Sequence, residues 1–155
     1  MGESLSFFKE AFRLEEVDAG MYSPLVLAYV GDAVYEIMIR TKVVNGGSVQ
    51  VNKLHKHSAA LVKAETQAKM VMALMEELTE EEMAVYKRGR NAKSYTSAKN
   101  ASINDYRRAT GFEALIGWLY LKGEFDRMTE LIKLGFEGIG AEILAVPEDT
   151  SEQEN

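Results

Sequence analysis

The chain has 155 residues, of which 46% are hydrophobic, and this suits a single globular domain with one core. It contains no cysteine, which excludes a disulfide framework and a thiolate metal site and fits a reducing compartment. The N-terminal residues lack the order of a signal peptide, and no apolar run approaches the roughly 18–20 residues that cross a bilayer, so we expect a soluble cytoplasmic protein without a membrane partner.

The hydrophobic pattern is helical nearly throughout, and no run alternates strictly over the length of a strand. Ser23 and Pro24 predict the start of a long helix that ends near Gly46. Ser48 can begin the next helix, which continues through two histidines towards Leu61.

Two later helices are preceded by side chains that can cap backbone N–H groups. Thr79 and Glu82 have the spacing of a capping box, after a helical pattern over residues 62–78. Ser102 and Asp105 have the related spacing before the apolar segment that follows them. Each motif therefore predicts a helix start.

The chain closes with an amphipathic stretch over residues 124–139. Beyond it lies a tail with five acids, no bases and one proline, which we expect to be solvated and disordered. The sequence thus predicts an all-α protein with a single helical domain at residues 21–141, an N-terminal extension at 1–20 and the acidic tail at 142–155.

Residues 25–39 and 109–121 are apolar almost all round, which predicts two central helices buried on most faces. Asp32 lies within the first run and Glu113 within the second, and neither run contains Lys or Arg. If the helices pack together, the two carboxylates need compensation, which a hard divalent cation such as Mg²⁺ can supply. Alternatively, each acid accepts hydrogen bonds from hydroxyl or backbone groups, or lies at a dimer interface. Glu36, one turn after Asp32, can share its face or point to solvent.

A second informative segment, residues 87–108, has seven basic residues against the single acid Asp105, hence a local charge of +6. Its centre is rich in Gly, Asn, Ser and Thr, which predicts a loop between two helices. Basic side chains together with amide and hydroxyl donors bind phosphate oxygens. This binding depends on the local electrostatic potential rather than on the net charge of −6. An ordinary solvated basic loop is the alternative. The candidate phosphate-binding residues are Lys87, Arg88, Arg90, Asn91, Lys93 and Lys99.

Other conspicuous residues point to structure rather than to chemistry. His55 and His57 are two positions apart, so on a helix they point to different sides and do not readily share a metal. We expect the eight methionines to fill the core and Trp118 to lie in the core or at a dimer interface.

Three segments in this order resemble the signature motifs of the ribonuclease III family. They are "YVGDAVYE" at residues 29–36, "LHKHSAALVKAETQAKM" at 54–70 and "TGFEALIGWLYL" at 110–121. The resemblance covers about residues 20–138. The short chain, the "RGRNAKS" segment and the absence of an appended double-stranded-RNA-binding domain resemble a branch of the family that consists of the catalytic domain alone.

This resemblance implies an Mg²⁺-dependent endoribonuclease that cuts double-stranded RNA as a homodimer and leaves 5′-phosphate ends. It also implies a role in maturing the ends of the 23S ribosomal RNA precursor, with a ribosomal protein as a further candidate partner. The family's metal-binding acids map onto Asp32 and Glu113, which become the predicted catalytic and metal-binding residues. Two other acidic positions of the family correspond to Ala28 and Thr110, which leaves the number of ions per site open.

Two alternatives stand beside this function. One is a non-catalytic helical RNA-binding protein that keeps the same fold, and the other is a helical interaction module without nucleic acid, which the acidic tail favours. If the basic segment is not the RNA path, the next candidates are Lys53, Lys56 and Lys63.

Overall fold

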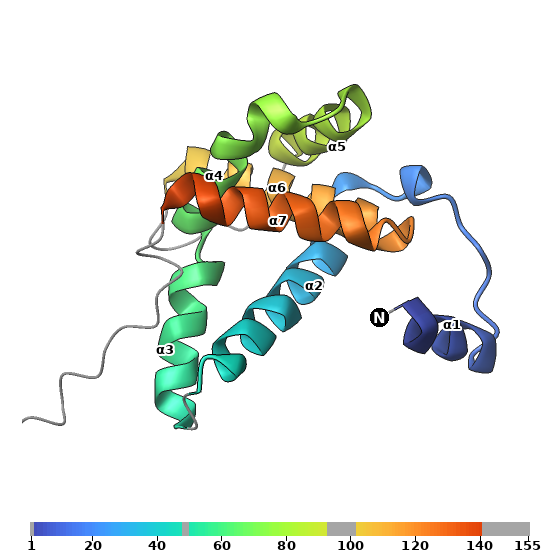
Figure 1. Ribbon diagram of the computed structural model, residues 1–155. Coiled ribbons are helices and arrows are strands. Elements are labelled where there is room, and N and C mark those ends of the chain that lie inside the picture. The colour runs from blue at the N-terminus through green and yellow to red at the C-terminus, as the bar shows by residue number, and fades with distance from the viewer. Residues whose placement is uncertain (1, 48–49, 93–101, 141–155) are drawn as a thin grey trace, which may run out of the picture.

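The computed structural model describes residues 2–47, 50–92 and 102–140, and every regular element in these ranges is helical (Figure 1). The prediction of an all-α protein is therefore confirmed for the described part of the chain. None of these helices combines the length and the apolar character that a membrane span requires. The elements are α1 (Gly2–Ala11), the short 3-10 helix η1 (Ala19–Met21), α2 (Pro24–Asn45), α3 (Val51–Val62), α4 (Ala64–Leu74), the 3-10 helix η2 (Met75–Glu77), α5 (Glu80–Asn91), α6 (Ile103–Leu121) and α7 (Phe125–Ile139).

The predicted caps are present at three helix starts. The Ser23 hydroxyl accepts a hydrogen bond from the backbone N–H of Val26 at 3.3 Å, directly before α2. The Thr79 hydroxyl accepts from the N–H of Glu82 at 3.2 Å, and the Glu82 carboxylate accepts from the N–H of Thr79 at 2.9 Å. Before α6, the Ser102 hydroxyl accepts a hydrogen bond from the backbone N–H of Asp105 at 3.1 Å. These bonds satisfy donors that a helix start leaves free.

The start of α3 differs from the prediction. The helix begins at Val51, and Ser48 lies outside the described residues. Gln50 occupies the cap position without a side-chain cap hydrogen bond, so this start lacks the local signal that marks the others. Lys63 has an extended backbone that separates α3 from α4.

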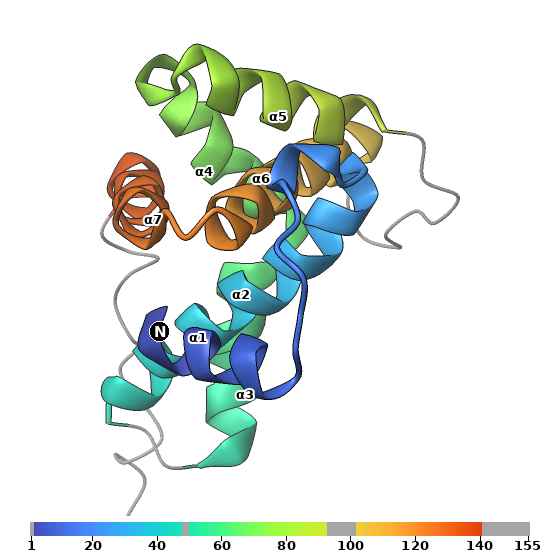
Figure 2. The same cartoon turned by 90° about the vertical axis from the view of Figure 1, so that its right-hand side faces the viewer.

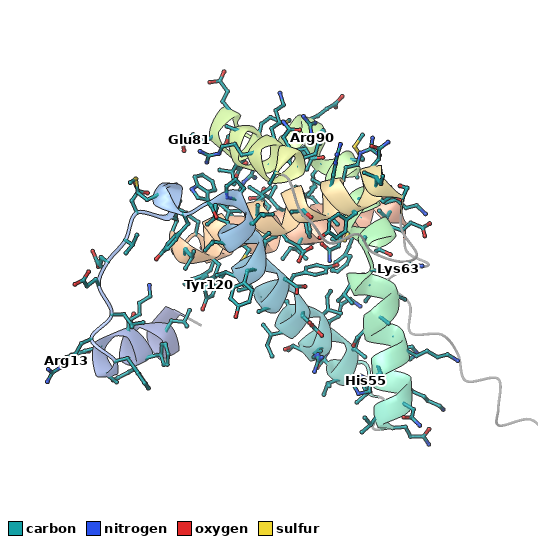
Figure 3. The ribbon with its side chains drawn as sticks, turned by 180° about the vertical axis from the view of Figure 1, so that it is seen from behind. Arg13, His55, Lys63, Glu81, Arg90 and Tyr120 are labelled. Carbon is teal, nitrogen blue, oxygen red and sulfur yellow. The ribbon has the colours of Figure 1, made fainter. Side chains whose placement is uncertain are left out.

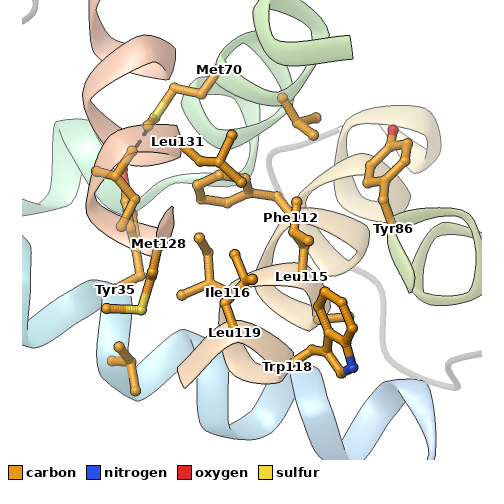
Figure 4. Close-up of a cluster of buried hydrophobic side chains, with 14 of the residues drawn as sticks. Tyr35, Met70, Tyr86, Phe112, Leu115, Ile116, Trp118, Leu119, Met128 and Leu131 are labelled. Atoms are coloured by element: carbon orange, nitrogen blue, oxygen red, sulfur yellow. Dashed lines mark hydrogen bonds between the residues drawn. The ribbon is translucent and has the colours of Figure 1, made fainter. Parts of the chain in front are cut away.

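Helix α6 is the centre of the fold and packs against α2, α4, α5 and α7 (Figure 2). Its residues 109–112 and 114–119 are buried, so this run is covered on most faces, as predicted. Phe112 lies among fully buried side chains from the neighbouring helices, including Met70 and Met128 (Figure 4). The ring of Tyr35 meets the Phe112 ring edge to face, with the centroids 5.4 Å apart, a favoured aromatic geometry.

Helix α2 corrects the sequence prediction, because it is buried on one side only. Leu27, Tyr35 and Ile39 face the core, whereas Tyr29 is 81% exposed and Ile37 is 56% exposed. The prediction failed because an all-round apolar helix needs neighbours on every side, and the described helices cover only one face of α2.

Helix α1 stands apart from the body of the molecule (Figure 1). Its aromatic side chains Phe7 and Phe8 are exposed, as is Phe12, which follows directly after the helix. Between this helix and the turn from α6 to α7 lies a groove of about 780 Å³, which Tyr120 and Phe125 line on the opposite side. Helix α1 falls within the predicted N-terminal extension, and the predicted acidic tail lies outside the described residues.

An ion pair ties α5 to α7. The guanidinium group of Arg127 donates two hydrogen bonds, of 2.9 and 2.8 Å, to the carboxylate of Glu82, and a third of 2.8 Å to the carbonyl oxygen of Glu77. Glu82 is 3% exposed, and the hydrogen bonds from Arg127 lower the pKa of its carboxyl. A buried carboxylate at the start of α5 is thus fully paired.

Candidate functional site

Asp32 and Glu113 come together where α2 crosses α6. Two glycines make this crossing close: a Cβ atom at Gly31 would overlap the carbonyl oxygen of Glu113, and a Cβ at Gly117 would overlap that of Leu27. Because Asp32 follows Gly31 directly, the backbone contact brings its carboxyl group beside that of Glu113, where the two form a hydrogen bond.

The environment of Glu113 favours a bound proton or cation over a free carboxylate. Burial, the charge of Asp32 and the hydrogen bond between the two side chains together raise the pKa of Glu113 to about 9, and burial has the largest effect. Among the described residues, no basic side chain lowers this pKa. The pair is therefore an uncompensated cluster of carboxyl groups.

One part of the prediction for this site needs correction. Glu113 is half-buried, but Asp32 is exposed, because it lies towards the side of α2 that the described helices leave uncovered. An exposed Asp32 leaves one side of the pair open to a substrate. Glu36, one turn further on, pairs with Arg40 at 2.6 Å and is not needed to explain the site.

The chemistry of this donor set fits a hard divalent cation. Two carboxyl groups in hydrogen-bonding contact offer the oxygen ligands that Mg²⁺ prefers. A bound cation would offset the negative charge of Asp32, which helps to raise the pKa of Glu113. No third His, Asp or Glu joins them within the described ranges. Thr110, at one position where the family has an acid, donates its hydroxyl to the carbonyl oxygen of Tyr106 at 3.0 Å, and Ala28 at the other offers no side-chain ligand.

Tyr35 packs in the core near Glu113 and is not a candidate ligand of the site. Its side chain is fully buried, and its hydroxyl donates to the carbonyl oxygen of Leu61 at 2.7 Å, which ties α2 to α3. Burial raises the pKa of Tyr35, and the nearby Glu113 raises it further, so the phenol stays neutral. Tyr35 is therefore a structural group one turn after Asp32.

The basic residues that we predicted to bind phosphate lie partly in a helix rather than in a loop. Helix α5 continues to Asn91, so Lys87, Arg88 and Arg90 belong to its last turns. Lys87 and Arg88 are exposed, and Arg90 is half-buried near the end of α5 (Figure 3). The sequence analysis placed the start of the loop too early, because Gly89 packs against α6 and does not end the helix. Lys93 and Lys99 lie outside the described residues.

The histidines lie away from the carboxyl pair on α3, with His55 exposed and His57 half-buried, so they face different surroundings as predicted (Figure 3). Trp118 is 8% exposed and belongs to the core cluster, with the Lys122 ammonium 4.1 Å from its ring centroid. Met70 and Met128 fill the core, whereas Met72 is 48% exposed, so the expectation for methionine holds only in part.

Sequence reasoning missed the residues that set the distance between the two acids. Gly31 and Gly117 interrupt apolar helical runs, and a glycine inside a helix is unfavourable unless a close approach requires it. That cost was a usable signal in the sequence. The ion pair between Glu82 and Arg127 was also missed, since 45 residues separate the partners.

Comparison with known proteins agrees with this arrangement. The family model for the ribonuclease III domain matches residues 25–124. The chain is 55% identical to a Mini-ribonuclease 3 of Clostridium tetani over 118 residues, covering 76% of this chain and 78% of the relative. It is 50% identical to a Mini-ribonuclease 3 of Brevibacillus brevis over 119 residues, covering 77% and 89%. An X-ray structure of a Fusobacterium nucleatum protein superposes with a TM-score of 0.69 at 30% identity, covering 77% of this chain and 96% of that one.

Proposed function

The chain belongs to the ribonuclease III family, and on that premise we propose that the carboxyl pair of Asp32 and Glu113 is its active centre. Its similarity to Mini-ribonuclease 3 proteins makes it an endoribonuclease that cuts double-stranded RNA, with a role in maturing 23S ribosomal RNA. The observation that carries the site assignment is the position of the half-buried Glu113 beside Asp32, where the pKa of Glu113 is raised and no described base lowers it. Both matched carboxyl groups are present, which argues against a non-catalytic RNA-binding protein.

Mg²⁺ is the cofactor that this site would take, held by the carboxylate oxygens of Asp32 and Glu113. When bound, it supplies neutralisation of charge on the scissile phosphate and activation of the attacking water. Helix α6 holds Glu113 in place, and the exposed Asp32 leaves a side from which RNA can enter. Because no third acid joins them within the described residues, water and the RNA phosphate would complete the set of ligands.

Recognition of the duplex rests on its shape and its phosphates. A-form RNA has a deep, narrow major groove that side chains do not read, so contacts go to phosphates and 2′-hydroxyl groups. Lys87, Arg88, Arg90 and Asn91 at the end of α5 are the proposed contacts, with Lys93 and Lys99 beyond the described part of this segment. We place this activity in the cytoplasm. A ribosomal protein is a further candidate partner, for which we propose no surface.

The enzyme acts as a homodimer in this proposal, and the apolar part of the uncovered side of α2 is the contact. Leu25, Val26, Tyr29 and Ile37 expose between 40% and 81% of their surface on this helix. Such a row of apolar side chains on one helix is typical of an interface rather than of a solvated surface. A second copy of the chain supplies the same row, as a two-fold interface requires.

Cleavage of duplex RNA by charge-neutralising variants tests the site. The purified protein should convert an RNA duplex into discrete products with 5′-phosphate ends only when Mg²⁺ is present. Asp32→Asn and Glu113→Gln should each abolish cleavage and keep duplex binding measured with Ca²⁺, because they remove charge and preserve size. Glu36→Gln is the matched control, one turn from Asp32 and paired with Arg40. Cleavage within a few-fold of wild type by either site variant would refute the assignment.

A further inference from the structure

Tyr86 is a buried residue that the site described above does not use. Its side chain is fully buried in α5, and its hydroxyl oxygen has no hydrogen-bond partner among the described residues. The ring lies at one side of the buried cluster, beside α6 (Figure 4). Gly111 fixes it there, because a Cβ atom at this position would lie 2.7 Å from two ring carbons. The phenol ring thus packs against α6 at Gly111, which is two positions before Glu113 in the chain.

Two arginines from different helices surround this phenol. Arg90 follows one turn later on α5, and its guanidinium carbon lies 5.6 Å from the centroid of the Tyr86 ring. Arg108 lies one turn before Gly111 on α6. Burial raises the pKa of Tyr86, whereas the charges of Arg90 and Arg108 and the side-chain interaction with Arg90 lower it.

Neither arginine is neutralised by a described acid. Arg90 contacts the Tyr86 ring and the side-chain oxygen of Asn91, and Arg108 forms no ion pair within the described ranges, although Asp105 lies one turn before it. Two positive charges therefore act on one buried hydroxyl group that meets no full hydrogen-bond geometry among the described residues. An anion would satisfy the guanidinium groups at once.

We propose that Arg90 and Arg108 together bind one phosphate group of the duplex RNA, and that Tyr86 is the positioning residue that orients the guanidinium group of Arg90. The inference rests on the proposed function, because it takes double-stranded RNA as the source of the phosphate. Guanidinium groups bind phosphate through two parallel N–H bonds, so their orientation decides how well they bind. The phenol oxygen can accept an N–H from a guanidinium group, and the ring face holds Arg90 by a cation–π contact.

The alternative is that Tyr86 only fills space between α5 and α6. In that case its hydroxyl would be a buried polar group without a purpose, and phenylalanine would serve as well or better. The two explanations differ in what happens when the oxygen alone is removed.

Tyr86→Phe removes that oxygen and keeps the ring. We expect the Kd for a short RNA duplex, measured with Ca²⁺ in place of Mg²⁺, to rise about 3- to 10-fold, as for the loss of one hydrogen bond. Under cleavage conditions KM should rise by a similar factor while kcat stays unchanged, because the variant affects binding and not the carboxyl pair. Thermal stability should be unchanged or higher. Wild-type affinity in Tyr86→Phe would overturn the positioning role.

Arg107 and Arg108 give a matched pair of variants on adjacent positions of α6. Arg107 is exposed, and its charge is not among those that shift the pKa of Tyr86. Arg108 is half-buried, and its charge lowers that pKa. Arg108→Ala should weaken duplex binding and make the slope of log K against log salt shallower by roughly 0.9, the change expected for one lost phosphate contact. Arg107→Ala removes the same charge and should change both quantities much less. Equal effects of the two variants would overturn the proposed phosphate site.

Coupling between the residues completes the test. In an Arg90→Ala background, Tyr86→Phe should cost little further affinity, because the group that it orients is gone, and fully additive losses would contradict this. Failure of the wild-type chain to bind or cut duplex RNA would refute the proposed function itself. Normal wild-type binding and cleavage, with equal losses in Arg107→Ala and Arg108→Ala, would refute only the phosphate site.

Discussion

Gly31 of α2 and Gly117 of α6 lie against each other's helix backbone, and neither position has room for a side chain. A Cβ at Gly31 would overlap the carbonyl oxygen of Glu113, and a Cβ at Gly117 would lie 3.0 Å from the backbone nitrogen of Gly31. The carboxyl groups of Asp32 and Glu113 meet only because these two backbones approach so closely. The separation of the two helices therefore sets the distance between the two carboxyl groups.

Adding one methyl group at this crossing should impair both stability and activity. Gly117→Ala forces α2 away from α6 and should lower the free energy of unfolding by about 1–3 kcal/mol, the usual cost of overpacking. RNA cleavage should fall far more than the unfolded fraction explains, because the two carboxyl groups separate. Urea denaturation and a cleavage assay on the same sample measure both effects. Gly20→Ala is the control, since the nearest atom to its Cβ would be 3.4 Å away, an ordinary contact. Full activity in Gly117→Ala would show that the crossing does not set the geometry.

The raised pKa of Glu113 makes the stability of the metal-free protein depend on pH. Between the ordinary carboxyl pKa of about 4.3 and the folded value of about 9, the folded state holds a proton that the unfolded state has lost. Stability therefore falls as the pH rises through this window. Glu113→Gln removes this dependence, so at pH 8 its Tm should exceed that of wild type by at least about 2 °C, whereas the two should converge near pH 4. Mg²⁺ should raise the Tm of wild type at pH 8 and leave the variant unchanged. Equal Tm values for wild type and variant at every pH would contradict a raised pKa of Glu113.

The exposed side of α2 predicts a dimer. At micromolar concentration the wild-type chain should sediment as a dimer, because apolar side chains such as Ile37, 56% exposed in one copy, are then covered. Ile37→Glu places a charge in that contact and should shift the equilibrium to monomer. Met72→Glu introduces the same charge at an apolar residue of α4 that is 48% exposed, and it should leave the dimer intact. A wild-type monomer at micromolar concentration, with activity proportional to enzyme down to nanomolar, would exclude this interface.

The ion pair of Glu82 and Arg127 should matter for stability and not for chemistry. Arg127→Ala leaves the buried Glu82 carboxylate without its cation and should cost about 3 kcal/mol in the free energy of unfolding. The hydrogen bonds from Arg127 lower the pKa of Glu82, so the stabilisation is present above the ordinary carboxyl pKa and is lost as the pH falls through the folded value. Urea denaturation at pH 7 and at pH 3 should therefore show a smaller difference from wild type at the lower pH. Glu130→Gln, which removes a partner of Arg127 whose side chain is 59% exposed, should cost at most about 1 kcal/mol.

Much of this architecture was predictable from short stretches of the sequence. The caps at Ser23, Thr79 and Ser102 involve side chains and backbone groups within three residues of one another, so the sequence alone identifies them. The lone acids in two apolar runs raised the possibility that Asp32 and Glu113 meet if the two helices pack together, and the structure brings them together. The match to the ribonuclease III domain, residues 25–124, includes both residues.

Other features depend on which helix faces meet, and the tertiary structure alone decided them. The same apolar pattern occurs in α2 and α6, yet α6 is enclosed by four helices and α2 leaves Tyr29, Ile37 and Asp32 exposed. Helix α5 runs on to Asn91 because Gly89 packs against α6. A pattern in one helix records how apolar each face is and carries no information about which neighbour covers it, since burial and close contact arise between segments that lie far apart in the chain.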